Sequence, residues 1–191
     1  MEEVTLHNVP KDTGWIEVIT GCMFSGKTEE LIRRLRRAQI AKQSVVIFKP
    51  RINTRYSANH IVSHNEQLLP SMVIDNPKEI LTAGKGAQVV GIDEAQFFSP
   101  DLIDVCERLA SMGKRVIVAG LDQDFRGKPF EPIPHLLAVA EYITKTLAIC
   151  MICGNPADRT QRITSENERV VVGAQNHYEA RCRKCFIPPS E

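Results

Sequence analysis

The sequence lacks any apolar run long enough to cross a bilayer, although 43% of its 191 residues are hydrophobic. Its first residues, Met1-Glu2-Glu3-Val4, are acidic, and they are not followed by the apolar segment of a secretory signal peptide. The net charge is only +1, so the chain also lacks the basic excess that accompanies a large nucleic-acid footprint. We therefore expect a cytoplasmic protein that engages neither a membrane nor nucleic acid.

Internal repeats and low-complexity tracts are also missing from the sequence. A chain of 191 residues is long enough for one sizeable core with a small appendage. Its six cysteines would indicate disulfides in a small secreted protein, but a reducing compartment points to other roles. Cys106 lies in a helical pattern, and we expect it in the core.

A glycine-rich stretch matches the P-loop pattern G-x-x-x-x-G-K-[ST] at every fixed position. Its members are Gly21, Cys22, Met23, Phe24, Ser25, Gly26, Lys27 and Thr28. An apolar, β-prone segment (15–20) precedes it, and a segment with helical spacing (27–42) follows. This context suits a phosphate site, because backbone N–H groups at a helix N-terminus hold the anion. We expect Lys27 to reach the β- and γ-phosphates and Thr28 to ligate Mg²⁺.

Strand and helix patterns alternate along the first three quarters of the chain. Further strands are expected at 44–49, 88–92, 115–120 and 142–149, and helices at 76–83, 99–112 and 134–140. This alternation predicts an α/β fold with a parallel sheet and helices on both faces. The composition changes after Ile149, so we predict an ATP-binding domain over 1–149 and a small subdomain over 150–191.

A second nucleotide element is the apolar segment 89–92, which ends in Asp93 and Glu94. An acid at the end of a buried strand is the Walker B arrangement, and its carboxylate holds Mg²⁺ directly or through water. Both this acid and the P-loop are expected at the C-terminal edge of the sheet, where ligands bind in open α/β folds. Glu94 either accepts a proton from an attacking hydroxyl or serves as a second acid around the metal.

Four of the cysteines form two C-x-x-C pairs, Cys150 with Cys153 and Cys182 with Cys185. Two such pairs can complete a tetrahedral Cys₄ zinc site, and the residues between them would form a long loop tied at its base. The rival interpretation is a redox pair, although redox chemistry needs only one C-x-x-C. A closed Cys₄ site leaves no open position, so we expect the zinc to be structural.

These motifs leave two distant classes of function open. One is an ATP-dependent kinase of a small molecule, and the other is a nucleic-acid-dependent ATPase, since Asp93-Glu94-Ala95-Gln96 can be read as a DEAQ box. A helicase core needs two RecA-like domains, and this chain has length for only one. A guanine-reading N-K-x-D motif, which a small GTPase would need, is not found in the sequence.

The motifs together resemble the type II thymidine kinases. The resemblance is carried by segments 21–28, 54–57, 91–98 and 120–125, and by the two C-x-x-C pairs around Val172-Gly173 and Tyr178. It extends over residues 15–185, with the motifs in the family's order and spacing. It implies a P-loop, RecA-like sheet and a small C-terminal subdomain, in which zinc anchors a "lasso" loop that closes over the nucleoside.

The resemblance also implies transfer of the γ-phosphoryl group of ATP to the 5′-hydroxyl of thymidine, with Glu94 as general base. The residues expected to bind ATP are Gly21, Cys22, Met23, Phe24, Ser25, Gly26, Lys27, Thr28, Arg55, Asp93, Glu94, Ala95 and Gln96. Those expected to bind the nucleoside are Phe97, Phe125, Arg162, Arg169, Val170, Val171, Val172, Gly173 and Tyr178. Members of the family are usually homotetramers, often inhibited by dTTP, and both properties are expected here.

Overall fold

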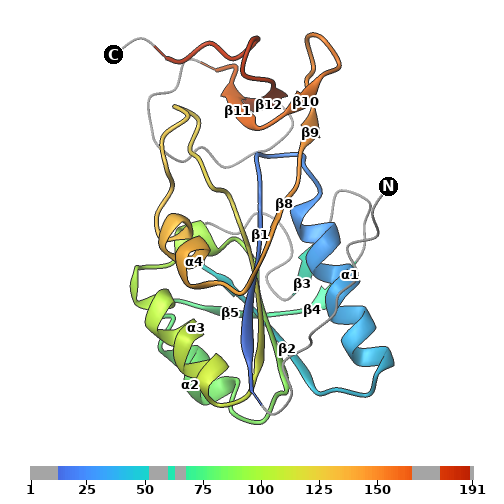
Figure 1. The fold of residues 1–191 in the computed structure, drawn as a ribbon, viewed down its shortest axis with the longest axis vertical. Coiled ribbons are helices and arrows are strands. Elements are labelled where there is room, and N and C mark those ends of the chain that lie inside the picture. Colours follow the sequence, from blue (N-terminus) through green and yellow to red (C-terminus); the bar gives the residue numbers. More distant parts are fainter. Residues whose placement is uncertain (1–12, 52–59, 63–67, 165–176, 190–191) are drawn as a thin grey trace.

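The computed structural model describes residues 13–51, 60–62, 68–164 and 177–189 (Figure 1). Its centre is a six-stranded sheet with the order β5-β2-β6-β7-β1-β8. All neighbouring strands of this sheet run parallel. The strands are β1 (Trp15–Thr20), β2 (Val45–Pro50), β5 (Met72–Ile74), β6 (Val89–Ile92), β7 (Arg115–Gly120) and β8 (Tyr142–Lys145). The predicted α/β fold with a parallel sheet is confirmed.

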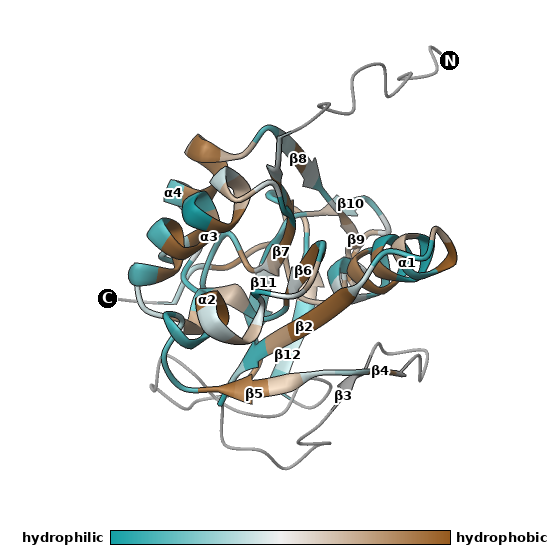
Figure 2. Ribbon diagram, turned by 90° about the horizontal axis from the view of Figure 1, so that it is seen from below, coloured by the Kyte–Doolittle hydropathy of each residue, from teal (hydrophilic) through white to brown (hydrophobic). Residues whose placement is uncertain are grey.

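Helices cover both faces of this sheet (Figure 2). One face carries α1 (Lys27–Ile40), and the other carries α2 (Glu79–Ala83), α3 (Asp101–Ser111) and α4 (Ile133–Val139). A short 3₁₀ helix, η1 (Ala95–Phe97), follows β6. No helix in the described ranges is both long enough and apolar enough to span a bilayer.

Two apolar clusters fill the space between the sheet and its helices. Successive side chains of β1 point to opposite faces, so Val18 belongs to the α3 side and Ile19 to the α1 side, and both are fully buried. Burial on both faces explains why the strands are almost continuously apolar. Cys106 lies in the cluster on the α3 side, so the prediction of a core cysteine is confirmed.

Within the described ranges, three small antiparallel sheets accompany the main one. They pair β3 (His60–Val62) with β4 (Leu68–Pro70), β9 (Ala148–Ile149) with β10 (Pro156–Ala157), and β11 (Arg159–Arg162) with β12 (Tyr178–Arg181). Figure 1 shows β9 to β12 at the end of the molecule where β1 meets α1. The C-terminal elements are therefore next to the predicted phosphate loop.

The structure corrects the expectation of one strand over 142–149. Only β8 joins the main sheet, and β9 belongs to a separate small sheet. The change occurs at Thr146, whose N–H donates to the carbonyl oxygen of Thr20 at 2.8 Å and whose hydroxyl shares a hydrogen bond of 2.8 Å with Ser25. These bonds hold the chain at the sheet edge before it turns away toward Cys150.

Candidate active site

The P-loop connects β1 to α1 and has an unusual backbone. Gly21, Phe24 and Gly26 have φ angles of 146°, 65° and 83°. A Cβ atom at Gly21 would lie 2.2 Å from the carbonyl oxygen of Thr146, so only glycine fits there. Ser25 closes the loop by donating to the carbonyl oxygen of Cys22 at 2.8 Å. The result is a compact turn that leads directly into the first turn of α1.

Lys27 points back into this turn. Its ammonium group donates to the carbonyl oxygen of Cys22 at 2.7 Å. Burial lowers the pKa of Lys27, while the negative charges of Glu94 and Asp93 act in the opposite direction. A partly desolvated ammonium beside two acids is suited to an anion that brings its own cation, such as a nucleotide phosphate with Mg²⁺.

Thr28 joins the P-loop to the acid at the end of β6. Its hydroxyl donates to the Asp93 carboxylate at 3.3 and 3.4 Å, and that residue is 6% exposed. Burial and the charge of Glu94 raise the pKa of Asp93 to about 7. A hydroxyl and two adjacent carboxylates form an oxygen-rich donor set that fits Mg²⁺, and a cation would relieve the repulsion between the acids.

Glu94 is held in the left-handed region, with φ 51° and ψ 40°. Its N–H donates to the Asp93 carboxylate at 3.0 Å, and its own carboxylate accepts a bond from Nε2 of Gln96 at 2.6 Å. The other amide atom of Gln96 accepts from the N–H of Leu121 at 3.0 Å. Two neighbouring acids therefore have separate partners, Thr28 for one and a fixed glutamine for the other.

A second group of side chains meets beyond the end of β7. The Arg162 guanidinium carbon lies 3.6 Å from the centre of the Phe125 ring, and Nη2 of this arginine donates to the Tyr178 hydroxyl at 2.7 Å. Phe125, Arg162 and Tyr178 are each between 7% and 8% exposed. Phe97 instead contacts Phe130 edge to face, with ring centres 5.8 Å apart. Phe125, Arg162 and Tyr178 thus form one cluster, and Phe97 packs in a different pair.

The four cysteines of the two C-x-x-C pairs come together directly after the C-terminal ends of β9 and β12. Their sulfur atoms all lie within 4.8 Å of one another, and two of the separations are 3.5 and 3.6 Å. These thiols are free, and the separations are far above the ~2.05 Å of a disulfide bond. Tetrahedral zinc with Zn–S bonds of about 2.3 Å would separate its sulfurs by about 3.8 Å, so the arrangement fits zinc.

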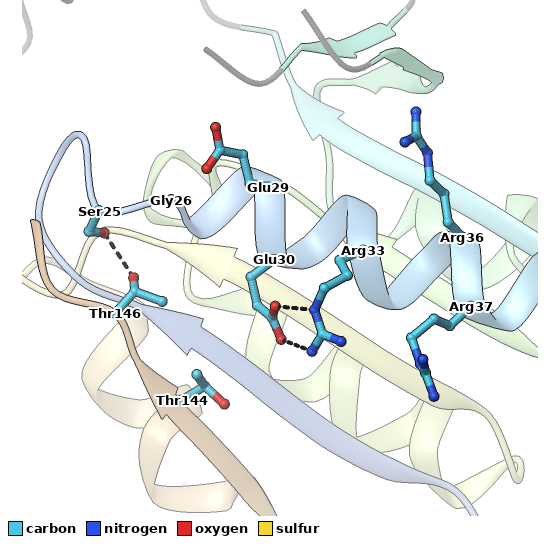
Figure 3. Close-up of a pocket in the computed structure, with 9 residues that line it drawn as sticks. All are labelled: Ser25, Gly26, Glu29, Glu30, Arg33, Arg36, Arg37, Thr144 and Thr146. Atoms are coloured by element: carbon cyan, nitrogen blue, oxygen red, sulfur yellow. Dashed lines mark hydrogen bonds and ion pairs between the residues drawn. The ribbon is translucent and has the colours of Figure 1, made fainter. Parts of the chain in front are cut away.

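An open hollow of about 780 Å³ runs along α1 from the P-loop (Figure 3). Its lining residues are Ser25, Gly26, Glu29, Glu30, Arg33, Arg36, Arg37, Thr144 and Thr146. Three of these residues are arginines of α1, and Arg33 is exposed. Arg34, in contrast, points toward the sheet, where it binds Glu17 of β1 at 2.7 Å and Thr144 of β8 at 2.8 Å.

Some predicted residues lie outside the described ranges, namely Arg55, Arg169, Val170, Val171, Val172 and Gly173. Conversely, two residues beside the P-loop were not singled out from the sequence. Thr146 shares a hydrogen bond of 2.8 Å with Ser25, and Thr160 accepts one of 3.1 Å from the N–H of Met23. Each is a lone threonine more than a hundred positions away, and no motif in the sequence marks it.

The strand, phosphate loop and helix, together with the acid that the loop threonine binds, define a P-loop nucleotide-binding protein of the α/β class. The sequence profile described as "Thymidine kinase" matches residues 14–186. A curated thymidine kinase of Rhodothermus sp. (strain ITI 518) is 62% identical over 176 residues, which is 92% of this chain and 83% of that protein. The chain belongs to the thymidine kinase family.

The ATPase DotB of Legionella pneumophila aligns with a TM-score of 0.46 and 13% identity, over 77% of this chain and 44% of its own.

Proposed function

We propose that this chain transfers the γ-phosphoryl group of ATP to the 5′-hydroxyl of thymidine. Membership in the thymidine kinase family gives the reaction class and the nucleoside. The observation that carries the residue assignment is the hydrogen bond between Thr28 and Asp93, with Glu94 beside them. It brings the phosphate loop and a separate proton acceptor to one edge of the sheet.

Phosphoryl transfer requires mainly positioning and neutralisation of charge. The P-loop amides and Lys27 would bind the phosphates, and Asp93 with Thr28 would hold Mg²⁺, which neutralises developing charge. Glu94 would accept the proton of the attacking 5′-hydroxyl. Its carboxylate is already oriented by Gln96, at 2.6 Å, so little reorganisation precedes the transfer.

The nucleoside is placed by the cluster of Phe125, Arg162 and Tyr178. An aromatic ring and a guanidinium that are both buried provide a flat apolar face and fixed hydrogen-bond donors, which suit a pyrimidine base. The contribution of Phe97 and of residues 169–173 is proposed from the family resemblance. The zinc that the four cysteines would hold ties the segment between them at its base and takes no part in the chemistry.

Several finer properties are proposed on the same resemblance. They are a homotetrameric assembly, inhibition by dTTP, a cytoplasmic location, and a division into an ATP-binding domain (1–149) and a lasso subdomain (150–191). Light scattering with and without dTTP, together with inhibition kinetics, tests the first two.

A screen of ATP consumption over the common nucleosides, with single-stranded DNA as a further additive, tests the function itself. We expect thymidine to stimulate consumption and to give dTMP. Lys27→Ala should lower turnover by several orders of magnitude, because it removes a charge that meets the transferring phosphates. Lys78→Ala is the control, since the side chain of this lysine is 62% exposed and forms a surface ion pair with Asp101. Stimulation by DNA alone would replace the kinase assignment with that of a nucleic-acid-dependent ATPase.

A further inference from the structure

The P-loop holds its unusual shape with help from the C-terminal part of the chain. Phe24 is not a glycine, yet its φ is 65°, between two glycines that also have positive φ. Such conformations persist only where the surrounding structure fixes them. The hydrogen bonds inside the loop, from Ser25 and Lys27, both end on the carbonyl oxygen of Cys22, so they depend on where that residue is held.

Two contacts hold this part of the loop from outside. The N–H of Met23 donates to the hydroxyl oxygen of Thr160 at 3.1 Å, and the thiol of Cys22 donates to the carbonyl oxygen of Ala157 at 3.3 Å. Thr160 lies in β11 and is 4% exposed, and Ala157 lies in β10 and is fully buried. Both acceptors therefore come from the segment between the two cysteine pairs.

An apolar cluster reinforces these contacts. Cys22 packs in it with two of the four clustered cysteines, Cys150 and Cys182, and with alanines at positions 148, 157 and 180. All six residues are less than 9% exposed. The first turn of the P-loop and the base of the cysteine cluster thus share one small core.

We propose that Thr160 is a positioning residue for the ATP-binding loop, so that the β11–β12 hairpin supports the ATP site directly, separately from any role over the nucleoside. Its hydroxyl takes up the N–H of Met23 and holds the loop in the phosphate-binding shape. This inference rests on the proposed function only in that the P-loop binds ATP.

Loss of the Thr160 hydroxyl should lower the fraction of molecules whose P-loop has the ATP-binding shape. Without the acceptor, the half-buried N–H of Met23 loses its partner whenever the loop has its present shape, which disfavours that shape. The apparent Kd for ATP then rises by the reciprocal of the fraction that remains competent. Once ATP is bound the loop is the same, so kcat at saturating ATP should change little.

The decisive variant is Thr160→Val, which keeps the shape of the side chain and removes the acceptor. We expect the Kd for ATP, from calorimetry, to rise about tenfold, while the KM for thymidine stays within about twofold. Hydrogen exchange of the P-loop amides should become faster, and exchange in β7 should not. Thr160→Ser restores a hydroxyl and should restore ATP binding.

Gln161→Met is the matched control. Gln161 is the next residue of β11, is 8% exposed, and makes two hydrogen bonds to the backbone of Ile187, at 2.8 and 3.0 Å, with none to the P-loop. Its loss should lower the melting temperature about as much as Thr160→Val does, but leave ATP binding unchanged. If Thr160→Val does not fold, Cys22→Ala decides, with an expected rise of about threefold in the Kd for ATP.

An unchanged Kd for ATP in Thr160→Val, an equal weakening in Gln161→Met, or a defect confined to the KM for thymidine would each overturn the proposal. A wild-type protein that binds ATP but does not phosphorylate thymidine would instead overturn the proposed function and leave this test intact.

Discussion

At the scale of single residues, the site depends on two neighbouring acids having different partners. Asp93 is bonded to Thr28 and buried, and Glu94 is bonded to Gln96. The left-handed backbone of Glu94 turns its side chain out of the strand direction, so the two carboxylates are not equivalent. This difference is the structural basis for assigning metal binding to one and proton transfer to the other.

Glu94→Gln tests this assignment. The substitution keeps the shape and removes the basicity, so we expect kcat to fall by ~10²–10⁴-fold while both substrates bind almost as before. If Glu94 is a metal-shell acid, the defect should instead appear as weaker Mg²⁺·ATP binding. A titration with Mg²⁺ separates the two, because recovery of kcat at high Mg²⁺ would contradict the role of general base.

Sequence patterns pointed to the residues expected to bind phosphate and metal, but not to the threonines that contact the P-loop from elsewhere in the chain. The P-loop and Walker B patterns identify Lys27, Thr28 and Asp93 because phosphate and metal binding restrict the residue types at fixed spacing. No such restriction applies to Thr146 or Thr160, where any small hydroxyl that reaches the loop would serve. Their role depends on how distant strands meet, which pattern alone does not contain.

At the scale of secondary-structure elements, the long buried strands were the most predictable. The strand over 115–120 coincides with β7, because a continuous apolar run bounded by a basic residue and a glycine has one plausible assignment. β5 was missed, since it has only three residues and an exposed methionine, 47% accessible, at its start. Short edge strands take their structure from the neighbouring strand rather than from their own sequence.

The contact between α1 and the sheet gives a prediction at this scale. A Cβ atom at Gly91 would lie 2.9 Å from a methyl group of Leu35, which is fully buried. Gly91→Ala should therefore destabilise the fold by about 1–3 kcal/mol, as expected for overpacking, measured by urea unfolding. Gly86→Ala is the control, because nothing lies within 4 Å of its Cβ position. Equal stability of the two variants would mean that α1 shifts freely on the sheet.

Glu17 connects three elements through charge. This glutamate of β1 is 6% exposed and accepts bonds from Arg34 of α1 at 2.7 Å and Arg115 of β7 at 2.6 Å. Burial acts to raise its pKa, but the two arginines and the Trp15 indole together outweigh burial and leave the pKa below its usual 4.5. A carboxyl with a lowered pKa stabilises the fold above the pKa of the unfolded chain, and this contribution is lost as the pH falls.

Glu17→Gln should therefore cost about 2–4 kcal/mol near neutral pH, since it leaves two arginines without their buried partner. The difference from wild type should shrink as the pH falls below the usual carboxyl pKa of 4.5, because the wild-type carboxyl also becomes neutral. Denaturant unfolding over a pH series measures this. Glu107→Gln, at an exposed position of α3, is the control and should change stability by less than ~0.5 kcal/mol. A pH-independent difference would show that shape, and not charge, explains the loss.

At the scale of the whole molecule, the C-terminal segment and the P-loop are joined by hydrogen bonds and by a shared apolar cluster. The sequence placed a boundary near residue 149, where the composition changes. The chain leaves the main sheet there, yet Cys22 and Met23 bond to the segment beyond it. A change of composition along the chain does not reveal which surfaces pack together in the fold.

The four clustered cysteines give a prediction at this scale, namely that the protein binds zinc. Elemental analysis should find about one zinc per chain, because the four sulfurs already lie within 4.8 Å of one another. Cys182→Ser should release the metal, which stabilises the fold around it, and should raise the KM for thymidine as the tied segment loosens.

If the shared cluster with Cys22 transmits the change, the Kd for ATP rises as well. Cys106→Ala, in the core on the α3 side, should keep its zinc. Metal-free wild-type protein with four readily titratable thiols at positions 150, 153, 182 and 185 would refute the zinc site, and normal ATP binding in Cys182→Ser would confine the metal's influence to the nucleoside side.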